Sequence, residues 1–298
     1  MKPLRLFLMA ALLSIVFGMN NVEAEDPPAL EWNNSFVSDI GYTSNTGAYS
    51  IQQTTDGNYI VAGSVGYVIS DTLQMDAILI KIDSNGNEIW NRTFSSQNNN
   101  NTFPDYTAAS SVKQTNDGGY IITGCYNCTG NADLLLIKTD GNGIEQWITR
   151  FNLTENGLEK GYDVMQTADN GFIVYGKQLV KFDSSGNEEW NQTFEGIVGM
   201  DTRIEQASDG GYVIVDITAF GGYDALVIKT DSNGTEEWNQ TFGGSGTDAI
   251  FSIQSVSDEG YILAGYTAGS FGNNSSVDGW LIKIDLEGNE KWNKTFGG

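Results

Sequence analysis

The stretch Ile80–Trp90, which reads Ile-Lys-Ile-Asp-Ser-Asn-Gly-Asn-Glu-Ile-Trp, decides the fold because its pattern occurs five times along the chain. In every copy a glycine follows an aspartate by three residues and a tryptophan follows it by seven. Self-similarity of this kind is the signature of a repeat architecture. The aspartate, glycine and tryptophan of the copies are Asp83, Gly86 and Trp90; Asp140, Gly143 and Trp147; Asp183, Gly186 and Trp190; Asp231, Gly234 and Trp238; and Asp285, Gly288 and Trp292.

A second motif precedes each copy, in which an aspartate is followed three residues later by an aromatic residue. The first example is Asp56-Gly57-Asn58-Tyr59. Glycine supplies the positive φ that a tight turn needs, and the aspartate side chain bonds the turn amides. Such turns between apolar runs predict antiparallel hairpins. The aromatic residues of this motif are Tyr59, Tyr120, Phe172, Tyr212 and Tyr261.

One repeat contains four short segments, which we call a, b, c and d in chain order. In the first repeat, segment a surrounds Ser50, b begins at Tyr59, c is 77–82 and d is 88–94. Segment c is apolar on both faces, as in a covered strand, whereas d alternates with period two. Four strands per repeat of about 43 to 58 residues predict a propeller blade. We therefore expect an all-β protein, a β-propeller of four-stranded antiparallel blades.

The number of blades depends on one surplus segment. Five complete a, b and c sets are present, but the d segment occurs six times, because Glu31–Phe36 has the same pattern. The sequence favours five blades, with this first copy helping to close the ring against the last blade. The alternative is six blades, one of them incomplete.

The combination of apolar strand, Asp-x-x-Gly turn and tryptophan strand resembles the repeat of quinoprotein-dehydrogenase-like (PQQ-like) propellers. The unit is also similar to secreted repeat proteins of archaeal and bacterial surfaces, through segments such as 117–121 (Asp-Gly-Gly-Tyr-Ile) and 238–244 (Trp-Asn-Gln-Thr-Phe-Gly-Gly). The resemblance covers essentially the whole chain after its leader. It implies a propeller fold, and it implies no activity because propellers carry unrelated functions.

The first 24 residues have the pattern of a secretory signal peptide. A basic start with Lys2 and Arg5 is followed by an apolar run from Leu6 to Met19 and a small-x-small cleavage pattern that ends at Ala24. We therefore expect residues 25–30 to be a linker, residues 31–298 to be one propeller domain, and the protein to be secreted or held at the cell surface without membrane insertion. An uncleaved N-terminal anchor is the alternative.

The charge balance and the missing histidine narrow the functional classes. Asp and Glu number 38 against 15 Lys and Arg, so the net charge is −23 at pH 7 and a phosphate backbone would be repelled. The sequence has no histidine, which removes Ser-His and Cys-His nucleophile pairs and most zinc sites. Enzymes that use only carboxylates remain open.

Only one face of the predicted propeller varies in loop length. The b–c connection runs over about a dozen residues between Ser64 and Met75 but is almost absent between Gly176 and Leu179. Variable loops on a rigid scaffold favour a binding face, although some of its aromatic rings would merely fix their own loops. The expected binding residues are Tyr67, Phe103, Tyr106, Tyr126, Phe220, Tyr223 and Phe271, accompanied by Asp71, Asp105 and Asp224.

The repeated residues have mainly structural interpretations. The tryptophans are expected to dock against the adjacent blade, and each Lys-x-Asp pair, such as Lys81 and Asp83, is expected to form a turn-fixing ion pair. Cys125 and Cys128 are expected to form a local disulfide, with free thiols as the alternative. Candidate glycosylation sites are Asn33, Asn91, Asn100, Asn127, Asn152, Asn191, Asn233, Asn239, Asn273, Asn274 and Asn293.

We expect no cofactor, with calcium as the ion to test. The turns 83–87 and 285–289 place oxygen side chains at alternate positions, faintly as in a calcium loop, but other copies have Gly or Ile where a ligand is expected, and a plain hairpin turn is the favoured explanation. The sequence favours a non-enzymatic binding or scaffold module for an extracellular protein or glycan. A glycoside hydrolase with Asp105 and Asp224 as its acids is an alternative, and the resemblance alone suggests a quinone-dependent dehydrogenase.

Overall fold

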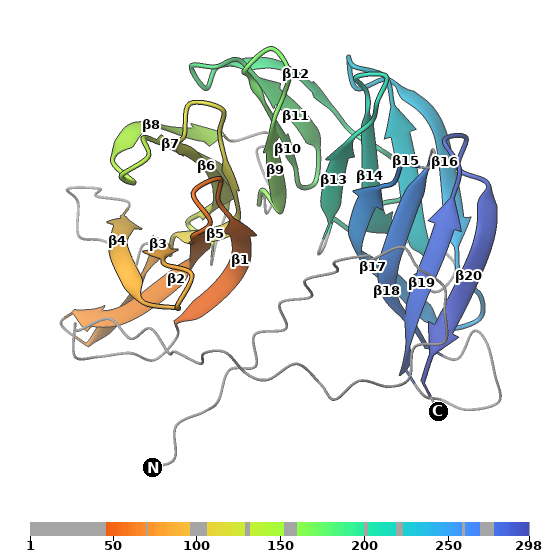
Figure 1. Ribbon diagram of the computed structural model, residues 1–298, viewed down its shortest axis with the longest axis horizontal. Coiled ribbons are helices and arrows are strands. Elements are labelled where there is room, and N and C mark those ends of the chain that lie inside the picture. Colours follow the sequence, from red (N-terminus) through yellow and green to blue (C-terminus); the bar gives the residue numbers. More distant parts are fainter. Residues whose placement is uncertain are drawn as a thin grey trace.

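The computed structural model describes residues 46–69, 71–95, 106–128, 132–151, 160–199, 202–218, 223–257, 260–268 and 277–297. These residues form five separate antiparallel sheets of four strands, each hydrogen-bonded in chain order, and they include no helix. The expected all-β propeller with five four-stranded blades is therefore confirmed. Figure 1 shows the blades following one another along an arc.

The strands of each blade correspond to segments a, b, c and d. The first blade is β1 (Gly47–Gln53), β2 (Tyr59–Ile69), β3 (Thr72–Ile82) and β4 (Glu88–Phe94); the second is β5 (Ala108–Gln114), β6 (Tyr120–Tyr126), β7 (Asp133–Thr139) and β8 (Glu145–Phe151); the third is β9 (Asp163–Gln166), β10 (Phe172–Tyr175), β11 (Leu179–Phe182) and β12 (Glu188–Gln192); the fourth is β13 (Arg203–Gln206), β14 (Tyr212–Ile217), β15 (Ala225–Thr230) and β16 (Glu236–Phe242); the fifth is β17 (Thr247–Ser255), β18 (Tyr261–Ala268), β19 (Val277–Ile284) and β20 (Glu290–Phe296).

The c–d turns have one repeated geometry. In the first blade, Asp83 Oδ1 accepts the backbone N–H of Asn85 at 2.9 Å and of Asn87 at 2.7 Å, and Gly86 has a φ of 82°. A residue with a side chain rarely adopts that conformation, so the glycine is required. Asp140, Asp183, Asp231 and Asp285 accept the equivalent backbone hydrogen bonds in the other blades.

The first b–c connection differs from the long loop that we expected. Strands β2 and β3 continue past Ser64 and Met75 and pair as far as Ile69 and Thr72. Valine, isoleucine, tyrosine and threonine in this stretch favour a pleated strand, so the insertion lengthens the hairpin.

The buried lysines pair with a different aspartate from the one that we expected. Lys81 Nζ lies 3.1 Å from Asp56, in the a–b turn, and Lys138, Lys181 and Lys229 contact the equivalent aspartates at 2.7–2.9 Å. The predicted ion pair within each Lys-x-Asp sequence is therefore wrong. Strand c lies beside strand b and brings the lysine to the a–b turn. The lysine thus ties strand c to the a–b turn of the same blade.

Each joint between consecutive blades is a hydrophobic cluster with residues of both. Strand β7 shows why segment c is apolar on both faces: Leu135 and Ile137 pack toward the first blade, and Leu134 and Leu136 pack toward the third. Two further clusters join the third blade to the fourth and the fourth to the fifth. Alternate side chains of one strand thus belong to different joints.

A tryptophan of strand d lies on the turn glycine of the next blade at all four described joints. A Cβ on Gly143 would lie 2.7 Å from the Trp90 ring, so only glycine fits below the indole. The Trp90 ring centre also lies 6.0 Å from that of Tyr120. Trp147 contacts Gly186, Trp190 contacts Gly234 and Trp238 contacts Gly288 in the same way.

The two ends of the arc expose residues that are covered elsewhere. Trp292 is 40% exposed and Phe296 is 55% exposed on the fifth blade, and Ile51 is 37% exposed on the first. Residues 1–45, with the expected signal peptide, the linker and the segment Glu31–Phe36, lie outside the described residues. The described part of the chain contains no helix that is long and apolar enough to cross a membrane.

Candidate binding face

The ends of strands b and the crossovers that lead into strands a share one face of the propeller. Gly161, which precedes β9, donates its N–H to the Gly124 carbonyl of the preceding blade at 2.9 Å. The backbone N–H of Thr107 donates to the Met75 carbonyl, and that of Asp248 donates to the Tyr223 carbonyl, both at 2.8 Å. These bonds between neighbouring blades hold the b–c ends in fixed positions.

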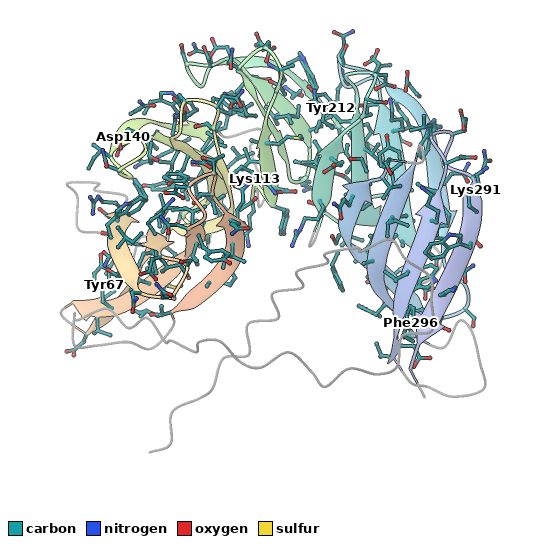
Figure 2. All side chains as sticks on the ribbon, viewed as in Figure 1. Tyr67, Lys113, Asp140, Tyr212, Lys291 and Phe296 are labelled. Carbon is teal, nitrogen blue, oxygen red and sulfur yellow. A yellow bond between two sulfur atoms is a disulfide. The ribbon has the colours of Figure 1, made fainter. Side chains whose placement is uncertain are left out.

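Four of the seven expected binding-face aromatics lie in the described part of the chain. Tyr67 lies on β2 and donates its hydroxyl to Asp76 at 2.7 Å; burial and Asp76 raise its pKa. Figure 2 places it on the long β2–β3 hairpin, well away from Asp140 in a c–d turn. Tyr106 pairs with Met75 in a short bridge. Phe103, Phe220 and Phe271, and with them Asp105, lie outside the described residues.

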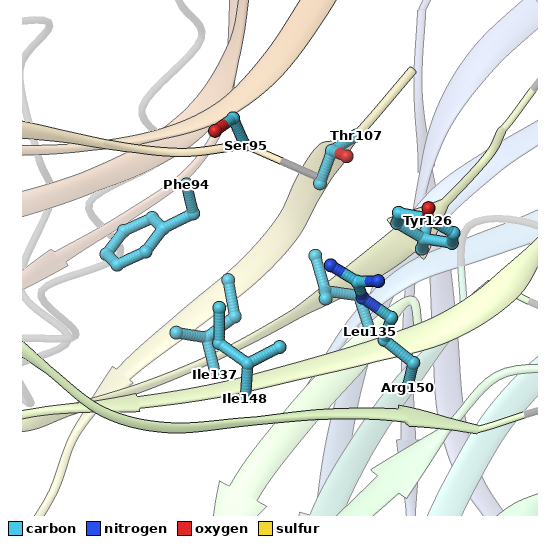
Figure 3. A pocket seen from close by; sticks show the side chains of 8 residues that line it. All are labelled: Phe94, Ser95, Thr107, Tyr126, Leu135, Ile137, Ile148 and Arg150. Carbon is cyan, nitrogen blue, oxygen red and sulfur yellow. The ribbon is translucent and has the colours of Figure 1, made fainter. Parts of the chain in front are cut away.

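Tyr126 is covered and therefore offers little surface. The Arg150 guanidinium lies 4.1 Å from the ring centre of Tyr126, a cation–π contact, and the tyrosine is buried. Figure 3 shows both beside Thr107 and Leu135 around a cavity of about 10 Å³, which holds no more than roughly one water molecule. This ring fixes its own surroundings.

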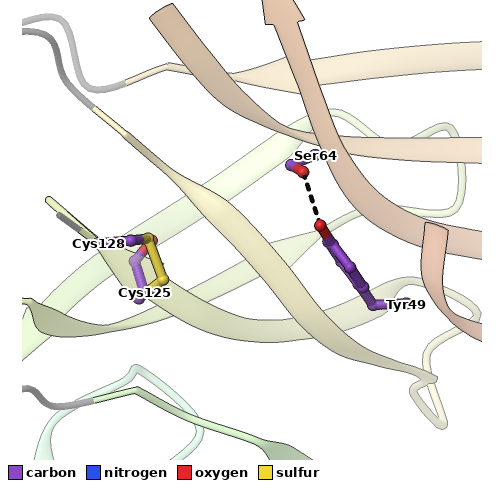
Figure 4. The surroundings of a disulfide bond; sticks show 4 residues. All are labelled: Tyr49, Ser64, Cys125 and Cys128. Atoms are coloured by element: carbon purple, nitrogen blue, oxygen red, sulfur yellow. Dashed lines mark hydrogen bonds between the residues drawn. A yellow bond between two sulfur atoms is a disulfide. The ribbon is translucent and has the colours of Figure 1, made fainter. Parts of the chain in front are cut away.

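The loop that follows Tyr126 is closed by a disulfide. Cys125 and Cys128 are bonded to each other, and Figure 4 shows the bond with its neighbours. Cys128 also donates its backbone N–H to the Tyr106 carbonyl at 2.9 Å. Asn127, between them, has a φ of 53°, which asparagine tolerates better than most residues. The short bridge keeps this connection tight against the neighbouring crossover.

A groove of about 390 Å³ lies between the third and fourth blades. Its lining combines three carboxylates with hydroxyl and amide groups over an apolar floor. Tyr223, next in the chain to one of these carboxylates, is 54% exposed and has a φ of 65°. The groove is lined by Glu195, Gly196, Thr218, Asp224, Leu226, Ile228, Glu236, Asn239 and Thr241.

Asp224 has an unusual environment within this groove. Its Oδ1 is inaccessible to solvent and accepts no hydrogen bond from the residues that the structure describes. A Cβ placed on Gly243 would lie 2.6 Å from Asp224 Oδ1 and 2.6 Å from Asp248 Oδ2, so two carboxylates meet at this glycine. Burial and the charge of Asp248 raise the pKa of Asp224. Asp224 is therefore a group that a proton or a cationic or hydroxyl-bearing ligand would stabilise.

Two buried carboxylates on the same face are used to join blades. Asp163 accepts hydrogen bonds from Ser111 of the second blade at 2.7 Å and from the Ile204 amide of the fourth at 3.2 Å. Asp216 accepts the Tyr175 hydroxyl at 3.0 Å. Neither residue could be predicted from the sequence, nor could Asp248 and Glu195, because no repeated motif contains them and the acid-rich composition gives no contrast.

The turns that we named as candidate calcium sites contain carboxylates that already accept hydrogen bonds. Asp83 Oδ2 accepts the Asn87 side chain at 3.0 Å, and Asp285 lies 2.6 Å from Lys291. Among the residues that the structure describes, no group of three or more His, Cys, Asp or Glu side chains is placed to hold a metal ion. Calcium binding stays a prediction.

The candidate glycosylation sites on strand d share one contact. Asn91, Asn191, Asn239 and Asn293 each donate their side-chain amide to the glutamate three residues before, at 2.5–2.6 Å. Asn127 and Asn233 lie in described turns. Asn33, Asn100, Asn152, Asn273 and Asn274 lie outside the described residues, and use of any of these sites stays a prediction.

No family model matches the chain, and no curated protein matches it. Solved structures do. The chain is similar to the periplasmic gluconolactonase PpgL of Pseudomonas aeruginosa, with 10% identity, 83% of this chain and 69% of that chain covered, and a TM-score of 0.52. A structure from Bacteroides uniformis, described as a candidate 6-phosphogluconolactonase, is 8% identical over 87% of this chain and 90% of that chain, with a TM-score of 0.50.

A third similar structure is the WD40 domain of Pan2 from Neurospora crassa, with 12% identity, 84% of this chain covered and a TM-score of 0.49. This chain spans 66% of that one. For the two structures with TM-scores of 0.50 and 0.52 the likeness is one of fold at these identities, which agrees with the propeller that the resemblance implied. Activity and ligand do not follow from it.

Proposed function

We propose that the protein is a secreted or cell-surface binding module that holds a glycan in the groove between its third and fourth blades. The observation that carries the proposal is a groove of about 390 Å³ with carboxylate, hydroxyl and amide groups in its lining, together with the exposed Tyr223, which directly precedes the lining residue Asp224 in the chain. Sugar hydroxyls donate to carboxylates and pair with amides, and the apolar face of a sugar ring packs on an aromatic ring.

The scaffold suits recognition because the groove lies on fixed elements. Strands β15 and β16 supply Leu226, Ile228, Asn239 and Thr241, and these strands pair along their whole length. A site on strands keeps its geometry when the ligand is absent, so less ordering entropy is lost on binding.

Binding of the mature chain, residues 25–298, to a glycan array and to cell-envelope fractions tests the proposal. We expect saturable binding that Tyr223→Ala weakens about tenfold or more, because one good contact of about 1.4 kcal/mol corresponds to that factor. Tyr49→Ala is the matched control, since Tyr49 is exposed on β1, outside the groove. Equal binding by both variants, or a protein ligand captured in place of a glycan, would contradict the proposal.

A second candidate function rests on the two carboxylates that meet at Gly243, Asp224 and Asp248, where burial and the charge of Asp248 raise the pKa of Asp224. A raised pKa shifts a carboxyl group toward the protonated form that general acid catalysis requires, and retaining and inverting glycosidases use such a group. Release of reducing sugar from polysaccharides by the mature chain, abolished by Asp224→Asn, would favour hydrolysis. Glycan binding without any release would assign the groove to recognition alone.

A further inference from the structure

The first blade carries one half of a joint that the other blades complete. Val61, Ile80 and Ile82 form a hydrophobic cluster with Tyr59 packed against it, and all of these described residues belong to the first blade. In the second blade the equivalent residues are Tyr120, Ile122 and Ile137, and they pack against the first blade in a cluster that contains Trp90 and Phe94. The outward face of the first blade is therefore built to receive a strand d.

The receiving turn is present as well. Gly86 has a φ of 82° in its turn, and Gly143, Gly186, Gly234 and Gly288, which all receive a tryptophan, have φ values of 74–81°. The chain thus repeats the receiving glycine five times, and four of these glycines have their tryptophan within the described residues.

The segment Glu31-Trp-Asn-Asn-Ser-Phe36 has the sequence of a donor strand. It matches Glu189–Phe194 and Glu237–Phe242 in its glutamate, Trp-Asn pair and final phenylalanine. Trp32 precedes Gly86 by almost the same number of residues as Trp90 precedes Gly143. About ten residues separate Phe36 from β1, enough to span roughly 33 Å.

We propose that residues 31–36 dock on the outward face of the first blade, with Trp32 on the Gly86 turn and Phe36 in the place that Phe94 takes at the next joint. The occupant is this segment of the same chain, and the face is the Val61, Ile80 and Ile82 cluster. The segment then seals the first blade, whereas the sequence alone suggested that it closes the ring against the last blade. The proposal is independent of the glycan groove.

Hydroxyl-radical footprinting of the mature chain tests the proposal without any substitution. Oxidation of each tryptophan, measured by mass spectrometry, reports its access to solvent. We expect Trp32 to be oxidised about fivefold more slowly than Trp292, at a rate like those of Trp90 and Trp238. Oxidation of Trp32 as fast as that of Trp292 would overturn the proposal. So would protection of Trp292 that rises with protein concentration while Trp32 stays reactive, because a second copy would then be the occupant.

A pair of variants provides the second measurement. In Trp32→Ala we expect hydrogen exchange at the amides of Val61 and Ile80 to accelerate about tenfold or more, with no change in the fourth blade. Trp292→Ala is the matched control and should leave the first blade unchanged. Trp32→Phe keeps an aromatic ring and should restore most of the protection. Unchanged exchange in the first blade of Trp32→Ala would show that another group covers this face.

Discussion

The joints inside the arc and the two faces at its ends are built from equivalent positions of the repeat, but these positions have different environments. The phenylalanine that follows the strand-d tryptophan by four residues is 7–9% exposed as Phe94, Phe194 and Phe242 and partly buried as Phe151, whereas Phe296 in the same position is 55% exposed. Val112, Val164, Ile204 and Ile253 are buried on strand a, while Ile51 is 37% exposed. A repeat residue thus contributes to stability only when the neighbouring blade supplies the other half of its contact.

Replacing a docked tryptophan should have the largest effect on this contrast. Trp190→Ala removes a ring that lies on Gly234 and near Tyr212 and leaves a cavity between two blades. We expect a loss of about 3 kcal/mol in unfolding free energy, seen as a fall of roughly 6–12 °C in Tm. Trp292→Ala should lower Tm by only about 2 °C. Equal falls for the two variants would mean that the Trp292 face is covered in solution.

The turn glycines allow a finer test of the same contact. Gly234→Ala places a Cβ 2.5 Å from the Trp190 ring and also strains a residue with a φ of 79°. Gly210→Ala has the same strain at a φ of 88° but open space around the new Cβ. We expect losses of about 2–3 kcal/mol and about 1 kcal/mol, respectively, in chemical denaturation. The difference between them measures the contact between blades, and no difference would show that the indole moves aside.

Contacts within a blade should not depend on its position in the arc, and the lysine–aspartate pairs test this. For Asp169, burial opposes ionisation, but hydrogen bonds from Thr167 and Lys181 outweigh it and lower the pKa to about 2. For Asp56, a hydrogen bond from Thr54 leads, and the pKa is also lowered. Because both pKa values lie below the ordinary value of about 3.9, their contribution is present above about pH 4 and is lost as the pH falls toward 2.

Asp56→Asn and Asp169→Asn should therefore have similar effects, each of about 1 kcal/mol or less, because more than half of each carboxylate side chain is exposed. Thermal unfolding at pH 7 and at pH 2.5 measures these effects. The substitutions should lower Tm at pH 7 and lower it less at pH 2.5, where part of the stabilisation from each ionised carboxylate has been lost. A loss confined to Asp169→Asn would show that the end blade is less ordered than the third.

The repeat itself allowed the fold to be predicted, and local pairing explains where the prediction was wrong. Glycine, aspartate and aromatic residues at fixed spacing are enough to set the turns and strands, since these depend on neighbouring residues in the chain. The predicted ion-pair partner of Lys81 was wrong because the pairing of the strands brings Lys81 to Asp56, and the spacing of the motif does not reveal that pairing. The extended hairpin that begins at Ser64 was predicted as a loop because its polar and glycine residues interrupt the alternation of apolar and polar side chains that is typical of a strand.

The candidate groove was only partly visible in the sequence. Tyr223 and Asp224 were found from the variable loop that contains them, whereas Glu195 and Glu236 come from other strands and crossovers. Residues of two blades meet there through the tertiary arrangement, and a single sequence has no signal for that meeting.

By itself, the sequence determined the four-stranded repeat, its turns and the residues available for docking, because spacing and turn chemistry act over a few neighbouring residues. The tertiary structure alone decided which copies of each residue are buried, which carboxylates meet at Gly243, and that Tyr126 lies under Arg150 while Tyr223 stays exposed. The reason is that burial is a property of pairs of blades, and five nearly identical sequences do not have five identical neighbours.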